Sequence, residues 1–285
     1  MSVIDLSRLP APTLVTVDYA ANKAARLASL QARLESAGLP YDVETIESDW
    51  GPVLQEEDGT RQMLDLQAIN DMAKALTLGY SKGADLDRLA ATFYADLGLE
   101  RMDGELDDRF ERRILLAAEA LAGALTAGGI EYRALTYDLR IIDAVAYEVG
   151  RGANRCVLLI EDGAPAEAIR AGVLARLREP KLRGTAELAV SLARPIEARL
   201  AVRLQHGRGP DPELLKTESL KSLGAVKARV ERKIAAPLTT DEIIAEGRVG
   251  GVSKLILDEP AADLIPGRDG VLRIVGIDVR TELAP

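Results

Sequence analysis

The side chains that could carry nucleophilic chemistry are scarce in this chain and widely separated in sequence. It contains one histidine, His206, beside two glycines, and one cysteine, Cys156, inside the apolar run 156–160. A cysteine and a histidine together can form a nucleophile and its base. A thiol within an apolar strand is a poor nucleophile, however, because burial favours its neutral form. We therefore expect Cys156 to be a small buried hydrophobe and His206 to lie in a loop.

Carboxylates are plentiful, and their densest group begins a long helical pattern. Its members are Asp103, Glu105, Asp107 and Asp108. The helix dipole favours negative charge at this end of a helix. Arg109 and Arg112 each follow an acidic residue by four positions, a spacing that stabilises helices. Helix stabilisation is therefore a sufficient explanation of this cluster, without a metal or an acid/base pair.

Other motifs that could bind a ligand are incomplete. The glycine pairs at 150–152 and 207–209 do not continue into a phosphate-binding loop, so we expect turns. The acidic stretches 56–58 and 161–163 lack the spaced oxygen ligands of a calcium loop. A lone cysteine excludes a disulfide framework and Cys-rich zinc sites. The sequence thus predicts no catalytic residue, no cofactor and no metal site.

Charge and hydropathy exclude further classes of protein. The formal net charge of the 285 residues is −9, and residues 41–60 hold much of it without a single basic residue. No basic stripe suited to nucleic acid is present, and no apolar run is long enough to cross a bilayer. No signal peptide is apparent, and the lone cysteine fits a reducing cytoplasm. We expect 41–60 to be extended, because its charges repel and Gly51-Pro52 interrupts a helix.

Two amphipathic helices are predicted in the N-terminal part. The first begins after a cap at Asp18 and ends near Ala37, and the second spans about 61–79. Their apolar positions are candidates for an interface with helices of the same bundle or of other chains: Leu27, Leu34, Leu66, Ile69, Ala73, Leu76 and Tyr80. The alternative is that these side chains only face a core within the chain.

After Gly129 the pattern changes to short strands alternating with helices. Strands are predicted at 145–149, 155–160, 188–192, 196–204, 252–257 and 271–279, with helices at 165–178, 213–234 and from 240. We interpret the chain as α+β, with an N-terminal helical region followed by two small ferredoxin-like units. The predicted divisions are 1–60 for an arm, a helix and an acidic linker, 61–140 for a helical domain, and 141–195 and 196–285 for the two units.

Three stretches resemble the baseplate J-like family of contractile phage tails. They are Gly83-Ala-Asp-Leu-Asp-Arg-Leu-Ala90, Glu100-Arg-Met-Asp-Gly-Glu-Leu-Asp-Asp-Arg-Phe-Glu-Arg-Arg-Ile114 and Ile4-Asp-Leu-Ser-Arg-Leu-Pro-Ala-Pro12. Residues 183–187 depart from a turn that is frequent in the family, and 235–240 looks shorter than usual. Both departures affect loops rather than the fold.

The resemblance implies a structural protein of the virion that is assembled in the host cytoplasm. Two copies would join one smaller gene I-like tail protein into a wedge, and six wedges would ring the hub. Further partners would be neighbouring wedges and the sheath-initiating and hub baseplate proteins, with no nucleic acid or membrane. The ring would hold the sheath and then widen to trigger contraction, as rigid domains moving about an interface do.

The alternative is a small-molecule enzyme of ferredoxin-like architecture with a carboxylate-only site, because fold alone does not fix function. An assembly protein should depend on its N-terminal helices for association. An enzyme should instead have a polar cleft between its sheets.

Overall fold

A computed structural model describes residues 9–39, 50–121, 126–150, 152–179, 187–209 and 211–284, and for 50–52 it describes the backbone only. The chain forms two compact units, Ser2–Arg101 and Met102–Pro285. Within the described ranges, no helix combines the length and the apolar composition needed to span a membrane.

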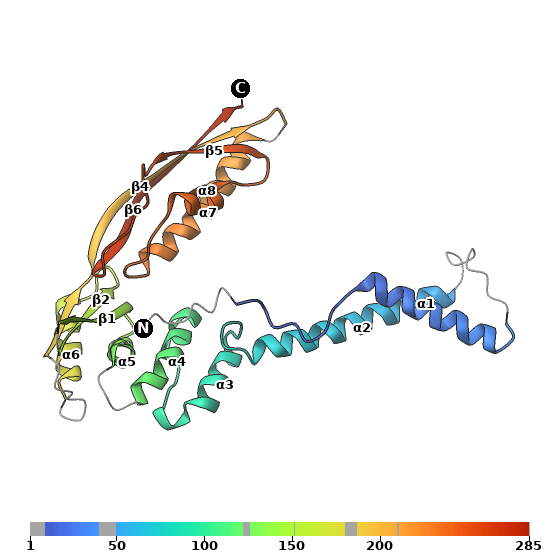
Figure 1. Cartoon of the computed structure of the whole chain (residues 1–285), viewed down its shortest axis with the longest axis horizontal. Coiled ribbons are helices and arrows are strands. Elements are labelled where there is room, and N and C mark those ends of the chain that lie inside the picture. The colour runs from blue at the N-terminus through green and yellow to red at the C-terminus, as the bar shows by residue number, and fades with distance from the viewer. Residues whose placement is uncertain are drawn as a thin grey trace. The chain divides into compact units, whose positions relative to one another are not determined.

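The first unit is helical. Its elements are α1 (Tyr19–Ser36), α2 (Trp50–Ala75), α3 (Ala84–Phe93) and the short 3-10 helix η3 (Ala95–Leu97). Asp18 caps α1 as predicted, because its carboxylate accepts a hydrogen bond of 3.0 Å from the Ala21 amide. Helices α1 and α2 lie side by side (Figure 1). In α3 the cap position is Gly83, and Asp85 lies in the first turn.

The expectation of an extended segment at 41–60 is wrong for its second half. Residues 40–49 lie outside the described ranges, but α2 is continuous from Trp50 onward. Pro52 falls in the first turn, where the missing amide hydrogen costs no helical bond. Glu56 pairs with Lys23, and Asp58 pairs with Arg26 at 3.1 Å, so α1 neutralises charges that would otherwise repel.

The second unit begins with a three-stranded sheet and three helices. In chain order the elements are α4 (Asp107–Leu121), α5 (Ala127–Tyr137), β1 (Ile141–Gly150), β2 (Ala153–Ile160), α6 (Ala166–Leu177) and β3 (Glu187–Leu192). The strand order is β1-β2-β3, with β1 antiparallel and β3 parallel to β2. One face of α6 is buried through Ile169, Val173 and Leu177, as its spacing predicted.

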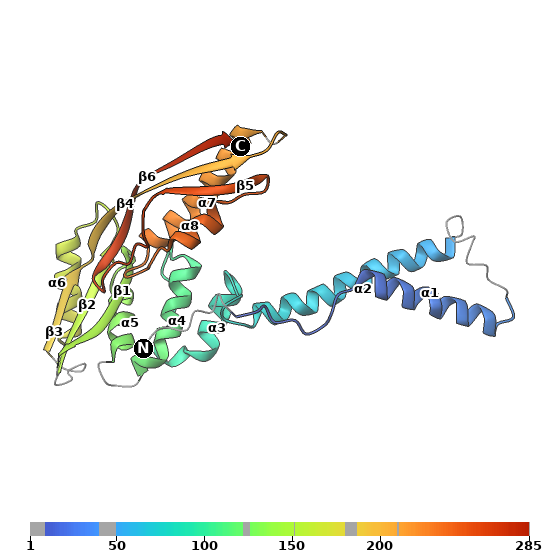
Figure 2. The ribbon, with the colours of Figure 1, turned by 45° about the horizontal axis from the view of Figure 1, so that its top comes forward.

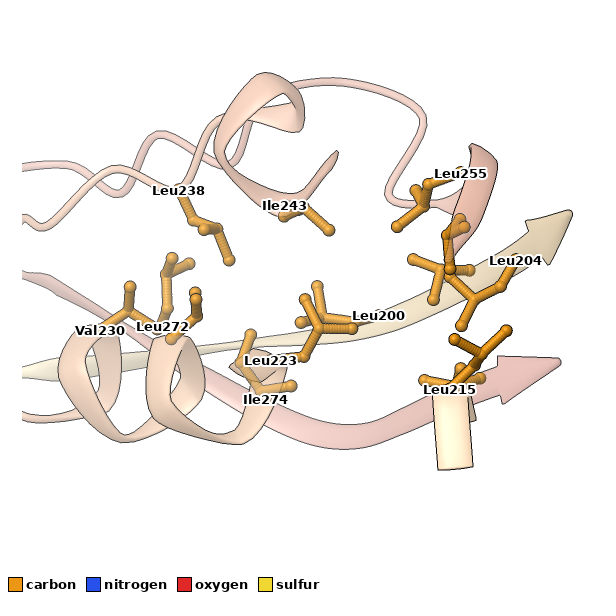
Figure 3. Packing of buried hydrophobic residues seen from close by; sticks show 14 residues of the cluster. Leu200, Leu204, Leu215, Leu223, Val230, Leu238, Ile243, Leu255, Leu272 and Ile274 are labelled. Carbon is orange, nitrogen blue, oxygen red and sulfur yellow. The ribbon is translucent and has the colours of Figure 1, made fainter. Parts of the chain in front are cut away.

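A second three-stranded sheet follows, and only Ala193 separates its first strand from β3. Its elements are β4 (Arg194–His206), α7 (Pro212–Glu231), α8 (Thr240–Gly247), β5 (Val252–Glu259) and β6 (Gly270–Leu283). The order is β5-β4-β6, with β6 parallel and β5 antiparallel to β4. Helices α7 and α8 cover one face (Figure 2). Figure 3 shows the core between the sheet and these helices, where Leu200 lies close to Leu223, and Leu204 lies near Leu215 and Leu255.

The α+β class with N-terminal helices is confirmed. Each sheet contains one parallel pair and one antiparallel strand, which is the mixed pairing that small α+β units use. The helix α6 joins β2 to β3, whereas α7, α8 and β5 lie between β4 and β6 in the chain. The division at 61, 141 and 196 stays a prediction. In the structure α4 and α5 pack with each other, and α5 packs on β1.

Close packing of α5 on α6 depends on Gly172. A Cβ atom added there would lie 1.9 Å from the Tyr137 hydroxyl oxygen. We expect Gly172→Ala to lower the free energy of unfolding by about 1 kcal/mol, because the partly exposed Tyr137 ring must move aside and lose its contact with α6. Gly224→Ala in α7 is the matched control, because its added Cβ meets nothing within 4 Å. Urea denaturation of both variants checks this, and equal stability of the two would contradict it.

Candidate functional site

Two arginines of α4, Arg109 and Arg113, are buried rather than solvated. Glu105 lies at the centre of the group, with ion pairs to Arg109 and Arg113. All three residues are buried. The predicted Glu105–Arg109 pair is therefore present, but it is part of the interior. Burial lowers the pKa of Arg109, while the charge of Glu105 acts in the opposite direction.

Side chains of α4 and α5 also cover the outer edge of β1. Arg109 Nε donates to the carbonyl of Ile141 at 3.0 Å, and Arg112 Nη2 donates to that of Ala144 at 2.7 Å. Glu131 of α5 accepts from the Ala146 amide at 2.8 Å. Burial raises the pKa of the Glu131 carboxyl, and these donors counteract that rise. The helices therefore satisfy an edge that would otherwise be unpaired.

Asp143 joins three elements at one buried carboxylate. Its side chain is 1% exposed and forms an ion pair with Arg112 of α4. Its Oδ2 accepts from the amide of Ile234, in the linker after α7, at 2.8 Å, and its Oδ1 accepts from Ala144 at 2.9 Å. Arg112 thus reaches Asp143 and Glu131, neither of them the partner within α4 that its spacing suggested. A single carboxylate therefore links α4, the first sheet and the linker after α7.

A second polar contact joins the two sheets. Asp269, in the turn before β6, accepts hydrogen bonds from the hydroxyl of Tyr147 and from Arg155 at 3.3 Å. Its backbone carbonyl accepts from the Arg194 amide at 2.7 Å. A cavity between the two sheets is lined by aliphatic residues such as Leu158, Leu192 and Leu272, and also by the charged side chains of Asp162, Glu231 and Arg273. Arg273 pairs with Asp162 at 2.6 Å.

Cys156 and His206 lie on different sheets. Cys156 is in β2, is fully buried, and its pKa is raised to about 12 by burial and then by the charge of Glu131. His206 is the last residue of β4 rather than a loop residue, and its Nδ1 lies 3.0 Å from the Gly207 carbonyl. The structure therefore does not bring the two together as a nucleophile and base.

The predicted interface residues divide between two faces of the N-terminal helices. Ile69 and Leu76 are exposed, at 41% and 74%. The remaining members are half-buried: Leu27, Leu34, Leu66, Ala73 and Tyr80. Tyr80 donates its hydroxyl hydrogen to the Leu9 carbonyl, which fixes the segment that precedes α1.

Sequence reasoning missed two features of α2. The side chain of Asn70 accepts from the amides of Leu14 and Val15 at 3.0 and 3.1 Å and donates to the Val15 carbonyl at 2.9 Å. On the outward face, Leu64 and Met72 are 65% and 64% exposed. Counting backwards from Leu76 in steps of four residues would have found Leu64 and Met72, since the row runs 64, 68, 72, 76. No such signal marked the role of Asn70.

Removing the charge of Asp143 tests the junction. We expect Asp143→Asn to lower the free energy of unfolding by about 3 kcal/mol, because it breaks a buried ion pair and leaves Arg112 with less compensation. Asp258→Asn is the control, because Asp258 pairs with Arg203 at the surface, and it should cost less than about 1 kcal/mol. Urea denaturation compares them, and equal losses would argue against a special role for Asp143.

Cys156 offers a second test, of the buried strand. With its pKa at about 12, the thiol is neutral at pH 8, so we expect the folded chain to react slowly with Ellman's reagent. Unfolding in urea should restore rapid reaction. Rapid, complete labelling of the folded chain at pH 8 would show that β2 is accessible.

Comparison with known proteins finds similarity to phage baseplate proteins. The model of the baseplate J-like N-terminal domain matches residues 47–99, which include α2 and α3. The chain is also 27% identical over 286 residues to baseplate protein J of Escherichia phage P2, and the alignment covers 93% of each chain. The resemblance to the baseplate J-like family, noted in the sequence, is therefore confirmed along almost the whole chain.

Proposed function

We propose that this chain is a structural component of a contractile tail baseplate, where its N-terminal helices join it to other chains. One observation carries the proposal beyond the similarity: α2 presents an exposed apolar row that no other described residue covers. The row consists of Leu64, Ala68, Met72 and Leu76, all exposed. Residues four apart form a ridge on one helical face, which is the feature that packs into the groove of another helix.

The rest of the unit supports this reading, because it stabilises the helices only weakly on its own. No residue of α1 is buried. The described contacts between α1 and α2 include ion pairs and hydrogen bonds at partly exposed positions, such as Arg26 with Gln62 at 2.9 Å. Isolated helices of this length are marginal in water, and surface ion pairs add little. A partner that covers the ridge would supply the missing apolar burial.

We infer a wedge in which the helices of this chain meet a second copy of it and a smaller gene I-like tail protein. The predicted interface set then has two roles. Ile69 and Leu76 contact the partner directly, while Leu66, Ala73 and Tyr80 hold the leading segment and α1 in place. The second unit, with its own covered sheets, contacts neighbouring wedges and the sheath-initiating and hub proteins.

Substituting the ridge tests the proposal. We expect Leu64→Ser, Met72→Ser and Leu76→Ser together to abolish baseplate formation in particles that carry this chain, because the exposed row no longer buries apolar area. Asp65→Ser with Gln67→Ser is the control, since these residues are also exposed on α2 but lie outside the apolar row. Negative-stain images would count complete tails. Normal tails with the ridge variant, together with an unchanged circular dichroism spectrum, would reject the proposal.

A further inference from the structure

Side chains reach the outer edges of three of the four edge strands, β1, β3 and β5. Arg109, Arg112 and Glu131 occupy the edge of β1, as described above. Arg170 Nη1 donates to the Val190 carbonyl of β3 at 3.3 Å, and Arg248 Nη2 donates to the Ser253 carbonyl of β5 at 2.9 Å. Such covering protects a sheet from pairing with another chain.

Only the first half of the β6 edge is covered in this way. The Gly270 carbonyl accepts from the Ala235 amide at 2.8 Å, and the Ile274 amide donates to Glu231 at 2.7 Å. From Ile277 to Leu283, no hydrogen bond from another described residue reaches the outer edge. This stretch of β6 therefore offers unpaired backbone groups to another chain.

The register shows which groups point outward there. In the parallel ladder, Leu283 lies opposite His206, and the Ala284 amide donates to the His206 carbonyl at 2.8 Å. In a parallel ladder, the residue directly opposite a bonded residue points its own amide and carbonyl away. The outward groups therefore belong to Ile277, Val279, Thr281 and Leu283.

The side chains of this stretch form two different faces. Val279 lies in the core under α7, and Ile277 packs against the same core. On the opposite face, the sequence alternates in charge through Asp278, Arg280 and Glu282. Arg280 pairs with Asp278 at 2.7 Å, and Glu282 accepts from Gln205 at 2.9 Å.

We propose that this open edge pairs with the same edge of a second copy, antiparallel and about a two-fold axis at Val279. This contact rests on the proposed assembly role and specifies one surface for it. With the axis at Val279, Asp278 of each copy lies opposite Arg280 of the other, so that opposite charges meet. The two sheets become one continuous sheet, and the outward groups of 277, 279 and 281 pair with each other.

Other registers fit less well. An axis at Arg280 places the arginine opposite its own copy and Asp278 opposite Glu282, which are like charges in direct cross-strand pairs. An axis at Thr281 would pair Arg280 with Glu282, but Glu282 is already held by Gln205 within the sheet. Asp278 has its ion pair only with Arg280 among the described residues, so two copies can exchange that pair symmetrically.

Paired cysteines test the contact in the full chain. Asp278→Cys and Arg280→Cys chains are prepared separately, mixed and oxidised. Opposite residues at this position of an antiparallel pair have Cα atoms about 4.5 Å apart, within disulfide range, whereas diagonal ones are about 7–8 Å apart. We therefore expect about tenfold more cross-linked dimer in the mixture than in either chain alone. Cys156 is buried and does not compete.

Two controls make the result decisive. A mixture of Arg280→Cys and Glu282→Cys chains reports the register centred on Thr281, and we expect little cross-linking from it. Thr281→Pro in both chains removes one outward amide without touching the bonds to β4, and it should abolish the cross-link. A mixture that gives no more dimer than the separate chains overturns the proposal, as does a stronger cross-link in the 280/282 mixture.

The ridge variant separates this contact from the proposed function. The cross-link should persist when Leu64, Met72 and Leu76 are replaced by serine, because the edge lies in the other unit. Loss of the cross-link in the ridge variant would show that β6 does not form the contact by itself. Normal tails with the ridge variant, alongside an intact cross-link, would reject the wedge role of α2 and leave the β6 contact standing.

Discussion

The burial of the Asp143 charge constrains the whole second unit. A carboxylate removed from water needs compensation from every side, and here Arg112, Ile234 and Ala144 supply it. Each donor comes from a different layer: a helix before the sheet, the linker after α7, and the strand itself. Because a buried charge tolerates no missing partner, the position of each layer fixes that of the others. An apolar contact of the same size would allow sliding that this arrangement forbids.

The first unit follows a different principle. Its helices α1 and α2 are held by ion pairs at partly exposed positions and by the Asn70 side chain, and no residue of α1 is buried. Polar contacts of this kind define a geometry without adding much free energy. Such a unit can keep its helices in register and still leave most of its stability to be gained on assembly. The two units thus divide the work between a rigid body and a surface for partners.

Periodicity predicted most elements because each one buries a single face. The alternation of Leu200, Val202 and Leu204 and the spacing of Val226 and Val230 identified a strand and a helix correctly. The start of α2 was missed because Gly51-Pro52 is a helix breaker in the interior but not in a first turn. The burial of Glu105 and Asp143 could not be predicted, because their partners lie on other elements and spacing along one helix reports only local pairs. The outward row at Leu64 was hidden by a second apolar stripe on the same helix.

The connection between the two sheets has a mechanical consequence. Ala193 alone separates β3 from β4, and its amide still donates to Leu158 at 2.8 Å, so the chain passes from one sheet into the next almost as one strand. Tension applied along that line is carried by the backbone itself and loads the ladder between β4 and β6 in shear, with its bonds sharing the force. A ladder pulled from one end opens bond by bond instead. A chain built in this way resists stretching far better than it resists peeling.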